Sequence, residues 1–331
     1  MNILVNLPDG FFQHPDLVPQ FDRLRKLGNL TCTSHDTDDQ IRGDLAAAEA
    51  VIMWSWPPLT DELLDQAPNL KYRGQLDITQ DAAATGLKRD VPISLSRSGW
   101  SPAVSEMALT LMLACLRRTS DYHAAMRAGT ESWVEAFPTD IDVRERQLTG
   151  RRVGIVGLGR IGKRLAELLM PFNIELLVAD PYIPEEALKP FNAKRVDIDT
   201  LCKESEIVVL CAAANDGTKH LIGQSQIDSM APNAILLNVA RAALVDMDAL
   251  TNRLKKGDLI AAVDVFETEP LPTDSPLRQL PNLYLTPHRS GGVMESVQRC
   301  IGWLIDDLEA VLAGKPQKYP VVEAMLPSLD K

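Results

Sequence analysis

Cysteine is scarce in this chain of 331 residues: there are five, an odd count, and no two have CxxC spacing. This argues against both a disulfide framework and a structural zinc site. Basic residues are also in the minority, because 34 Lys and Arg stand against 45 Asp and Glu, a formal net charge of −11. Such a surface repels phosphate backbones and anionic lipids, so nucleic acid is disfavoured as the main ligand.

Long hydrophobic runs are missing as well. The apolar run 107–116 is far shorter than the roughly 18 residues of a membrane span, and the start MNILVNLPDG lacks the charged region of a secretory signal. We therefore expect no membrane segment and a reducing cytoplasmic location. Apolar residues make up 45% and charged residues 24% of the chain, which is typical of a globular protein. The length predicts two domains.

Short runs of Val, Ile and Leu alternate with helical patterns almost from end to end. This order predicts βα units on parallel sheets, so the expected fold class is α/β with two doubly wound domains. The N-terminal third forms one small α/β domain, and a long, mostly apolar helix at 101–118 follows, which must be buried between domains or subunits. The predicted strands of this third are 3–5, 50–53 and 91–95, and its predicted helices include 17–27 and 60–67.

The βα rhythm is strongest between residues 152 and 288, where about six strands predict one complete doubly wound sheet. After them, 293–313 reads as a long amphipathic helix closed by Gly314, which we expect to pack back on the first domain. The six predicted strands are 153–156, 175–179, 206–211, 234–239, 260–266 and 283–286.

A glycine-rich turn follows the first of these strands, with the sequence Gly157-Leu158-Gly159-Arg160-Ile161-Gly162. In a strand-turn-helix context, Gly157 permits a tight turn, Gly159 lets a pyrophosphate approach the backbone, and Gly162 lets helix and strand pack closely. The helix N-terminus offers free N–H groups to the phosphates. The sequence therefore predicts a dinucleotide site, although a ligand-free βα turn has the same composition.

The next strand ends at Asp180, 18 residues beyond Gly162. An acidic side chain there accepts hydrogen bonds from the ribose hydroxyls and repels a 2′-phosphate. No Arg or Lys occurs in 180–186, so NAD is predicted over NADP. Without the glycines, Asp180 would equally fit a turn or capping aspartate before a proline.

Three further motifs occur in order: NVARAALVD at 238–246, DVFETEP at 264–270 and TPH at 286–288. With the phosphate loop, they resemble the D-isomer-specific 2-hydroxyacid dehydrogenases over nearly the whole chain, most strongly from 133 to 288. The resemblance implies a flavodoxin-like substrate domain formed by 1–100 and 289–331. A central Rossmann domain for NAD, 101–288, would be inserted in it, with the active site between the two.

The resemblance also assigns roles to single residues. Arg241 would bind the carboxylate of a 2-oxo acid and polarise its carbonyl, since a guanidinium is planar and always charged. His288 would be the acid/base, and Glu269 would orient it and favour its protonated form. Asp264 would hold the nicotinamide carboxamide. The other implied cofactor contacts are Arg160, Ile161, Cys211, Val239 and Ala240, beside the glycines and Asp180; no metal is implied.

Each of these residues has an ordinary structural alternative when taken alone. Arg241 could be a surface ion-pair partner, Glu269 a solvated loop acid and His288 a core histidine. Their joint placement at strand ends of one doubly wound sheet favours the site. The cluster His35-Asp36-Thr37-Asp38-Asp39 lacks the turn glycine and final glutamate of a calcium loop, so a metal is not expected there.

The chain departs from the family pattern at several positions. Ala242 follows the arginine where the family usually has Gly, and the loop expected to supply backbone amides to the carboxylate reads Arg73-Gly74-Gln75-Leu76-Asp77. Arg289 follows the histidine, either as a second cation for the substrate or as a solvated side chain. Trp54 either lines the pocket and restricts side-chain size or packs as core. The candidate substrate contacts are thus Trp54, Gly74, Gln75 and Arg289.

The resulting hypothesis is an NAD-dependent dehydrogenase for a small D-2-hydroxy or 2-oxo acid. By the resemblance, the helix at 101–118 and the loop around Trp133 correspond to family dimer contacts, so a homodimer through the NAD domain is expected. Two alternatives stay open: oxidation of another small anion such as phosphite, and an NAD-sensing binding protein like the family's transcriptional corepressors.

Overall fold

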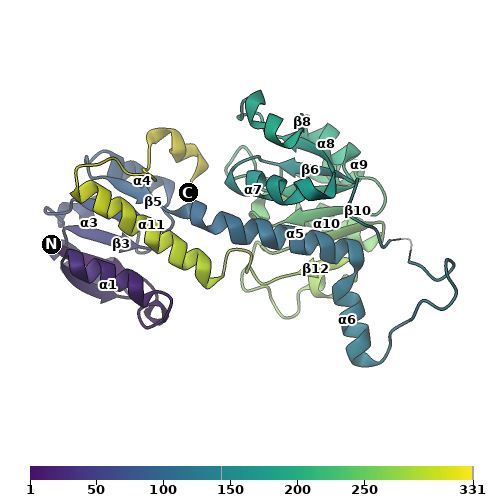
Figure 1. The fold of residues 1–331 in the computed structure, drawn as a ribbon, viewed down its shortest axis with the longest axis horizontal. Helices are drawn as coiled ribbons and strands as arrows, with labels where there is room; N and C mark the ends of the chain where they lie inside the picture. Colours follow the sequence, from purple (N-terminus) through teal and green to yellow (C-terminus); the bar gives the residue numbers. More distant parts are fainter. Residues whose placement is uncertain (143, 330–331) are drawn as a thin grey trace. The chain divides into compact units, whose positions relative to one another are not determined.

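The computed structural model describes residues 1–142 and 144–329. The chain divides into two compact units, and each is described by itself (Figure 1). Unit 1 comprises Met1–Trp100 and Gly292–Lys331, and unit 2 comprises Ser101–Gly291.

Unit 1 contains a five-stranded sheet with the order β2-β1-β3-β4-β5, in which every pair of neighbours is parallel. Successive residues of β1 and β3 alternate between two cores, because neighbouring side chains on a strand point to opposite faces. Both faces are therefore covered, as a parallel sheet requires. The strands are β1 (Asn2–Asn6), β2 (Asn29–Thr33), β3 (Ala50–Met53), β4 (Tyr72–Gln75) and β5 (Ile93–Leu95).

Four helices of unit 1 contribute to these two cores, while α4 packs in a third cluster with β5. α1 and α11 contribute to the core that contains Ile3 and Ile52, while α2 and α3 contribute to the core that contains Leu4 and Val51. The predicted return of the C-terminal helix to the first part of the chain is confirmed, since the Tyr72 hydroxyl donates to the carbonyl oxygen of Leu304 at 2.7 Å. The helices are α1 (Val18–Leu27), α2 (Asp38–Ala47), α3 (Asp61–Asp65), α4 (Gln80–Leu87) and α11 (Met294–Leu312).

Unit 2 contains a seven-stranded parallel sheet with the order β12-β11-β10-β9-β6-β7-β8. Its strands are almost entirely apolar and buried, which is typical of a parallel sheet covered on both faces. They are β6 (Arg152–Val156), β7 (Glu175–Ala179), β8 (Lys194–Arg195), β9 (Ile207–Leu210), β10 (Ala234–Asn238), β11 (Leu259–Val263) and β12 (Leu283–Leu285).

The described part of unit 2 contains six α-helices. They are α5 (Ser101–Arg117), α6 (Thr119–Ala128), α7 (Arg160–Leu169), α8 (Ile198–Glu204), α9 (Gln224–Ser229) and α10 (Met247–Lys255). An extended segment follows α6, as Figure 1 shows.

One helical stretch of the described chain, Arg97–Arg117, is long and apolar enough to span a membrane by length and composition, and half of its most apolar window is buried. A core helix of a folded domain meets the same criteria. α5, which makes up most of this stretch, packs against α7, β10 and β11 within unit 2. Its apolar character is thus accounted for at least in part by packing inside the protein.

The predicted class, two α/β domains with parallel sheets, is confirmed. Two details of the prediction are wrong. The second sheet has seven strands rather than about six. The strand that was not predicted is β8, which has only two residues, both basic. Residues 73–75, expected in a loop, lie in β4, where Arg73 and Gln75 are buried polar side chains. Neither strand has the apolar run by which strands are recognised from sequence.

Strand register brings the candidate site residues of unit 2 to one edge of its sheet. Val156 at the end of β6 lies opposite Ala179 of β7 and Leu210 of β9. On the other half of the sheet, Val263 of β11 lies opposite Asn238 of β10 and Leu285 of β12. The loops that follow these ends carry the phosphate loop and the three later motifs, at the carboxyl edge where ligands bind in doubly wound sheets.

Candidate active site

The phosphate loop has the geometry that a dinucleotide requires. Gly157 has φ +88°, and a Cβ there would lie 2.7 Å from the backbone nitrogen of Ala212. A Cβ at Gly162 would lie 2.3 Å from the carbonyl oxygen of Gly157. By contrast, a Cβ at Gly159 would meet no atom within 4 Å. The loop is closed by two close backbone approaches and open at Gly159, so it fits a pyrophosphate.

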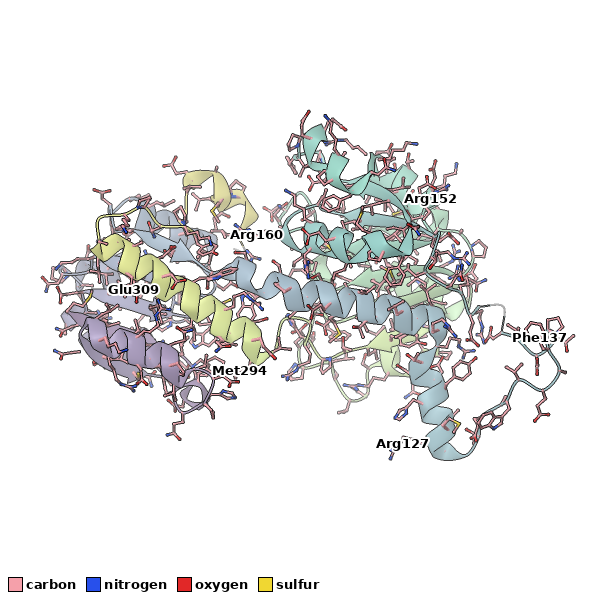
Figure 2. The ribbon with its side chains drawn as sticks, viewed as in Figure 1. Arg127, Phe137, Arg152, Arg160, Met294 and Glu309 are labelled. Carbon is pink, nitrogen blue, oxygen red and sulfur yellow. The ribbon has the colours of Figure 1, made fainter. Side chains whose placement is uncertain are left out.

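Gly159 is also the N-cap residue of α7, and the helix starts at Arg160, whose exposed side chain is labelled in Figure 2. Its position gives the opening free backbone N–H groups and the positive end of a helix dipole. Ile161, the second residue of the helix, is partly buried. The structure thus places the predicted cofactor residues 157–162 around one opening.

Asp180 follows β7 and lies under the same loop. Its Oδ2 accepts from the backbone N–H of Leu158 at 2.9 Å, and its Oδ1 accepts from that of Tyr182 at 2.9 Å. Sequence reasoning missed one neighbour, Arg195 of β8, whose guanidinium donates to the carbonyl oxygen of Asp180 at 2.7 Å and pairs with Glu185 at 2.7 Å. Although 180–186 contains no Arg or Lys, a cation from another strand therefore lies close to Asp180.

The other predicted cofactor contacts follow β9 and β10. Burial raises the pKa of the Cys211 thiol to about 12, so this thiol is neutral at physiological pH. Val239 and Ala240 are buried. Their turn is shaped by Asn238, whose side chain accepts from Ala240 N at 3.1 Å and donates to the carbonyl oxygen of Arg241 at 2.8 Å.

Arg241 is held at this turn by its guanidinium, which donates to the carbonyl oxygen of Ala240 at 2.8 Å. The following residue, Ala242, opens a short 3-10 helix, Ala242–Leu244, without a positive φ. Alanine is therefore accommodated where the family usually has glycine, because the backbone conformation does not require one.

His288 and Glu269 form the closest pair of candidate catalytic side chains. Nδ1 of His288 lies 2.7 Å from Oε2 of Glu269, and Oε1 of Glu269 accepts from the backbone N–H of Phe266 at 2.8 Å. Partial burial alone would raise the pKa of Glu269, but the hydrogen bonds with His288 and from Phe266 outweigh it and lower this pKa. An ionised Glu269 makes Nδ1 the protonated nitrogen, which leaves Nε2 for a substrate.

A cavity of about 590 Å³ in unit 2 is lined by this pair. Its other walls are mostly apolar, with one cation, Arg278, whose guanidinium donates to the carbonyl oxygens of Leu271 and Pro272 at 2.8 and 2.9 Å. Sequence reasoning missed Arg278, since it lies outside every motif. The remaining lining residues are Phe266, Pro270, Leu271, Leu285, Thr286 and Pro287.

Asp264, at the end of β11, has no exposed surface. Oδ1 accepts from the Thr286 hydroxyl at 2.6 Å and from Arg289 N at 2.9 Å, and Oδ2 accepts from Ser290 N at 2.8 Å. The sequence places Asp264 in a motif but gives no sign of these three contacts, because their donors lie 22 to 26 residues further along the chain. Its contact with a carboxamide stays a prediction.

The candidate substrate contacts in unit 1 lie at strand ends of the five-stranded sheet. Trp54 follows β3 and belongs to an aromatic cluster, with ring centroids 5.2 Å from Trp56, 5.6 Å from Trp100 and 6.1 Å from Phe11. Gly74 and Gln75 are buried in β4. With its amide oriented to satisfy both bonds, Gln75 donates to the carbonyl oxygens of Asp77 and Trp54 at 2.9 and 3.1 Å. Gln75 thereby supports the backbone beneath Trp54.

His35 has an ordinary partner, since its Nε2 lies 2.9 Å from Oδ2 of Asp44. In the chain as described, without residues 143, 330 and 331, no group of three or more His, Cys, Asp or Glu side chains could hold a metal ion.

Comparison with known proteins gives the family. Residues 109–290 match the model of the D-isomer specific 2-hydroxyacid dehydrogenase NAD-binding domain. The chain is 31% identical over 299 residues to a D-3-phosphoglycerate dehydrogenase of Methanocaldococcus jannaschii, covering 88% of this chain and 55% of that protein. It is 34% identical over 278 residues to a glyoxylate/hydroxypyruvate reductase B of Pectobacterium atrosepticum, covering 82% and 84%.

Among solved structures, D-mandelate dehydrogenase of Rhodotorula graminis matches with a TM-score of 0.82 and 26% identity over 97% of both chains. The chain therefore belongs to the D-isomer-specific 2-hydroxyacid dehydrogenase family, and the family predicted from its motifs is confirmed. Unit 2 contains the family's NAD-binding domain, so the prediction of a nicotinamide cofactor is confirmed too. The chain spans about half the length of the phosphoglycerate dehydrogenase and most of the reductase.

Proposed function

We propose that this protein transfers a hydride between NAD(H) and a small 2-hydroxy or 2-oxo acid of the D (R) series. The observation that carries the proposal is the His288–Glu269 pair, 2.7 Å apart, on the wall of a cavity of about 590 Å³ in the NAD-binding unit. The phosphate loop and the strand ends of the NAD-binding unit would hold the cofactor, whose nicotinamide would supply or accept the hydride. The protein's own side chains then have to bind the acid and move one proton.

His288 moves that proton. With Nδ1 hydrogen-bonded to Glu269, Nε2 gives a proton to the substrate oxygen during reduction and takes it back during oxidation. Glu269 keeps the ring in one orientation and one tautomer. Arg241 binds the substrate carboxylate and polarises the carbonyl through its fixed fork of N–H donors.

The proposed cofactor is NAD rather than NADP. Asp180 supports this, because its carboxylate sits under the phosphate loop and repels a 2′-phosphate. Arg195 lies nearby, but the carboxylate of Glu185 neutralises its charge at 2.7 Å. The cofactor contacts proposed with Asp180 are those of the phosphate loop and of Cys211, Val239, Ala240 and Asp264.

Four residues are proposed to select the substrate: Trp54, Gly74, Gln75 and Arg289. Trp54 is the main candidate to limit side-chain size, since its indole is fixed by three neighbouring aromatic rings. Gly74 and Gln75 lie in β4 and are proposed to influence substrate binding by fixing the backbone of the loop that follows this strand. The segments 1–100 and 289–331 are proposed to form the substrate domain.

We also propose that the protein works as a homodimer in the cytoplasm. The segment after α6 supports the dimer, because Trp133, Val134 and Phe137 are 67%, 65% and 75% exposed. Phe137 is labelled on this segment in Figure 2. Large apolar side chains gathered on one exposed segment are typical of a subunit interface. Light scattering of the purified protein tests this state.

The function is tested by following the loss of NADH absorbance with glyoxylate, hydroxypyruvate, pyruvate, phenylpyruvate and 2-oxoglutarate. At least one of these acids should be reduced, and His288→Ala should abolish its turnover while still binding NADH. Equal turnover by the variant would remove His288 from the mechanism. NADH binding without reduction of any acid would contradict the proposed substrate class.

A further inference from the structure

The loop that carries His288 has an unusual backbone. His288 has φ +51°, in the left-handed region that residues with a Cβ rarely adopt. The conformation therefore has to be imposed by contacts on either side of the residue. Two backbone–backbone hydrogen bonds hold this part of the loop. His288 N donates to the carbonyl oxygen of Thr286 at 3.0 Å, and Thr286 N donates to that of Val263 in β11 at 3.1 Å.

The remaining contacts come from one side chain, Asp264. Its carboxylate binds the hydroxyl of Thr286 before His288 and the backbone N–H groups of Arg289 and Ser290 after it, at 2.6, 2.9 and 2.8 Å. Both oxygens are used, and none of the residue is exposed. Hydrogen bonds to a buried carboxylate are short and strong, so they fix the path of the chain on both sides of the histidine.

Asp264 and Glu269 act on the same histidine from one segment. Asp264 fixes the backbone around His288, and Glu269 fixes its imidazole through Nδ1 at 2.7 Å. Glu269 is itself held by the N–H of Phe266, two residues beyond Asp264. A small displacement of the loop would therefore change the direction of Nε2, which has to face the reacting oxygen.

We propose that Asp264 is a positioning residue, which clamps the loop 286–290 so that His288 is held ready for proton transfer. This inference rests on the proposed function, since it assigns a role within the same reaction. It adds to the proposed contact of Asp264 with the nicotinamide carboxamide and does not exclude it, because Oδ2 accepts one hydrogen bond from the loop and a carboxylate oxygen can accept two. In the described structure that carboxylate is buried and engaged by three donors of the loop.

Asp264→Asn is the main test variant, because its amide N–H would face at least one of these donors and break the clamp while preserving the size of the side chain. kcat should fall on the order of 10²-fold, as expected when a catalytic group is displaced. The KM of the acid should change little. Amides in a peptide covering 286–291 should exchange with deuterium faster than in the unsubstituted protein.

Thr286 offers a graded test that keeps Asp264. Thr286→Val removes one hydrogen bond of the clamp, which is expected to lower kcat about 10-fold. Thr286→Ser keeps the hydroxyl and should restore kcat toward that of the unsubstituted enzyme. This pair carries the test if Asp264→Asn fails to fold.

Asp197→Asn is a matched control in the same unit. Asp197 also accepts from a backbone N–H and a hydroxyl, both of Thr200, at 2.7 and 3.0 Å, but at the start of α8. This change should leave both kcat and the deuterium exchange of 286–291 unaltered.

One result would overturn the proposal: Asp264→Asn leaves the deuterium exchange of 286–291 unchanged. If NADH binding is also weakened in that case, the carboxylate acts on the cofactor alone. If the unsubstituted protein reduces no acid, the proposed function fails, and the exchange experiment still decides the clamp: faster exchange supports it and unchanged exchange refutes it.

Discussion

Gly159→Ala should separate NADH binding from folding, because the added methyl group occupies space that the protein itself does not use. A Cβ at Gly159 meets nothing within 4 Å, and φ is −72°, which alanine adopts freely. The change in the free energy of unfolding should therefore stay within about 1 kcal/mol, a shift in Tm of about 2–4 °C. The methyl group lies at the start of α7, where the pyrophosphate has to approach the backbone.

Gly159→Ala should instead weaken the binding of NADH. If the pyrophosphate is displaced enough to lose one charge-assisted hydrogen bond from the helix start, about 1.5–3 kcal/mol of binding free energy is lost. This corresponds to NADH binding that is about 10- to 100-fold weaker. NADH fluorescence titration measures the affinity, and thermal unfolding without cofactor measures stability.

Two other glycines serve as controls. Gly43→Ala adds the same methyl group in α2 of unit 1, where a Cβ also meets nothing within 4 Å, and should not change NADH affinity. Gly162→Ala should lower both stability and NADH affinity, since its Cβ would lie 2.3 Å from the carbonyl oxygen of Gly157. Undiminished NADH affinity in Gly159→Ala would refute the placement of the pyrophosphate. A large decrease in the Tm of Gly159→Ala would contradict the free space around a Cβ at this position.

Three other changes test individual residues. Asp180→Ala should narrow the preference for NADH over NADPH in kcat/KM, and an unaltered ratio would mean that the ribose is recognised elsewhere. Because the folded-state pKa of Glu269 is lowered, its ionised form stabilises the protein above the ordinary glutamate pKa, and this contribution is lost as the pH falls through the lowered value. Glu269→Gln should accordingly reduce Tm at about pH 6, and the reduction should shrink as the pH falls through the lowered pKa of Glu269; a reduction that does not change with pH would contradict the ionised pair. Trp54→Leu should raise kcat/KM for phenylpyruvate relative to glyoxylate, and an unchanged ratio would remove Trp54 from substrate selection.

The strands flanking the phosphate loop could be predicted from the sequence to the residue or nearly so. After one charged residue, Arg152 or Glu175, β6 and β7 contain only apolar residues and glycine, and parallel strands buried on both faces have that composition. The turn glycines lie directly after the first of them. Local sequence therefore predicts both the strand and the proposed role of the loop that follows it.

β4 could not be predicted in the same way. Its Arg73 and Gln75 are polar, yet both are buried, because the helices of unit 1 cover the sheet on each side. Burial of a polar side chain in a central strand depends on tertiary packing, which leaves no periodic signal in the sequence. The loop expected at 73–77 came from the family resemblance and not from a periodic pattern, and residues 73–75 of it lie in β4.

In the candidate site, too, some residues could be predicted from local sequence and others depend on tertiary packing. Arg241, Glu269 and His288 stand in short motifs, and motif order identified them. The clamp formed by Asp264 and the proximity of Arg195 to Asp180 depend on which strands are neighbours in the sheet. Strand order is a property of the whole fold, so contacts across it appear only once the fold is known.

The central claim is that C2 of a 2-oxo acid receives a hydride from the nicotinamide while His288 supplies the proton. The most direct measurement is reduction of the best acid of the panel with NADH that carries deuterium at both positions of nicotinamide C4, followed by NMR and chiral analysis of the product. The account predicts deuterium on C2, the D configuration wherever C2 is a stereocentre, and no such product with His288→Ala. An L product, a product without deuterium at C2, or unchanged product formation by His288→Ala would contradict it.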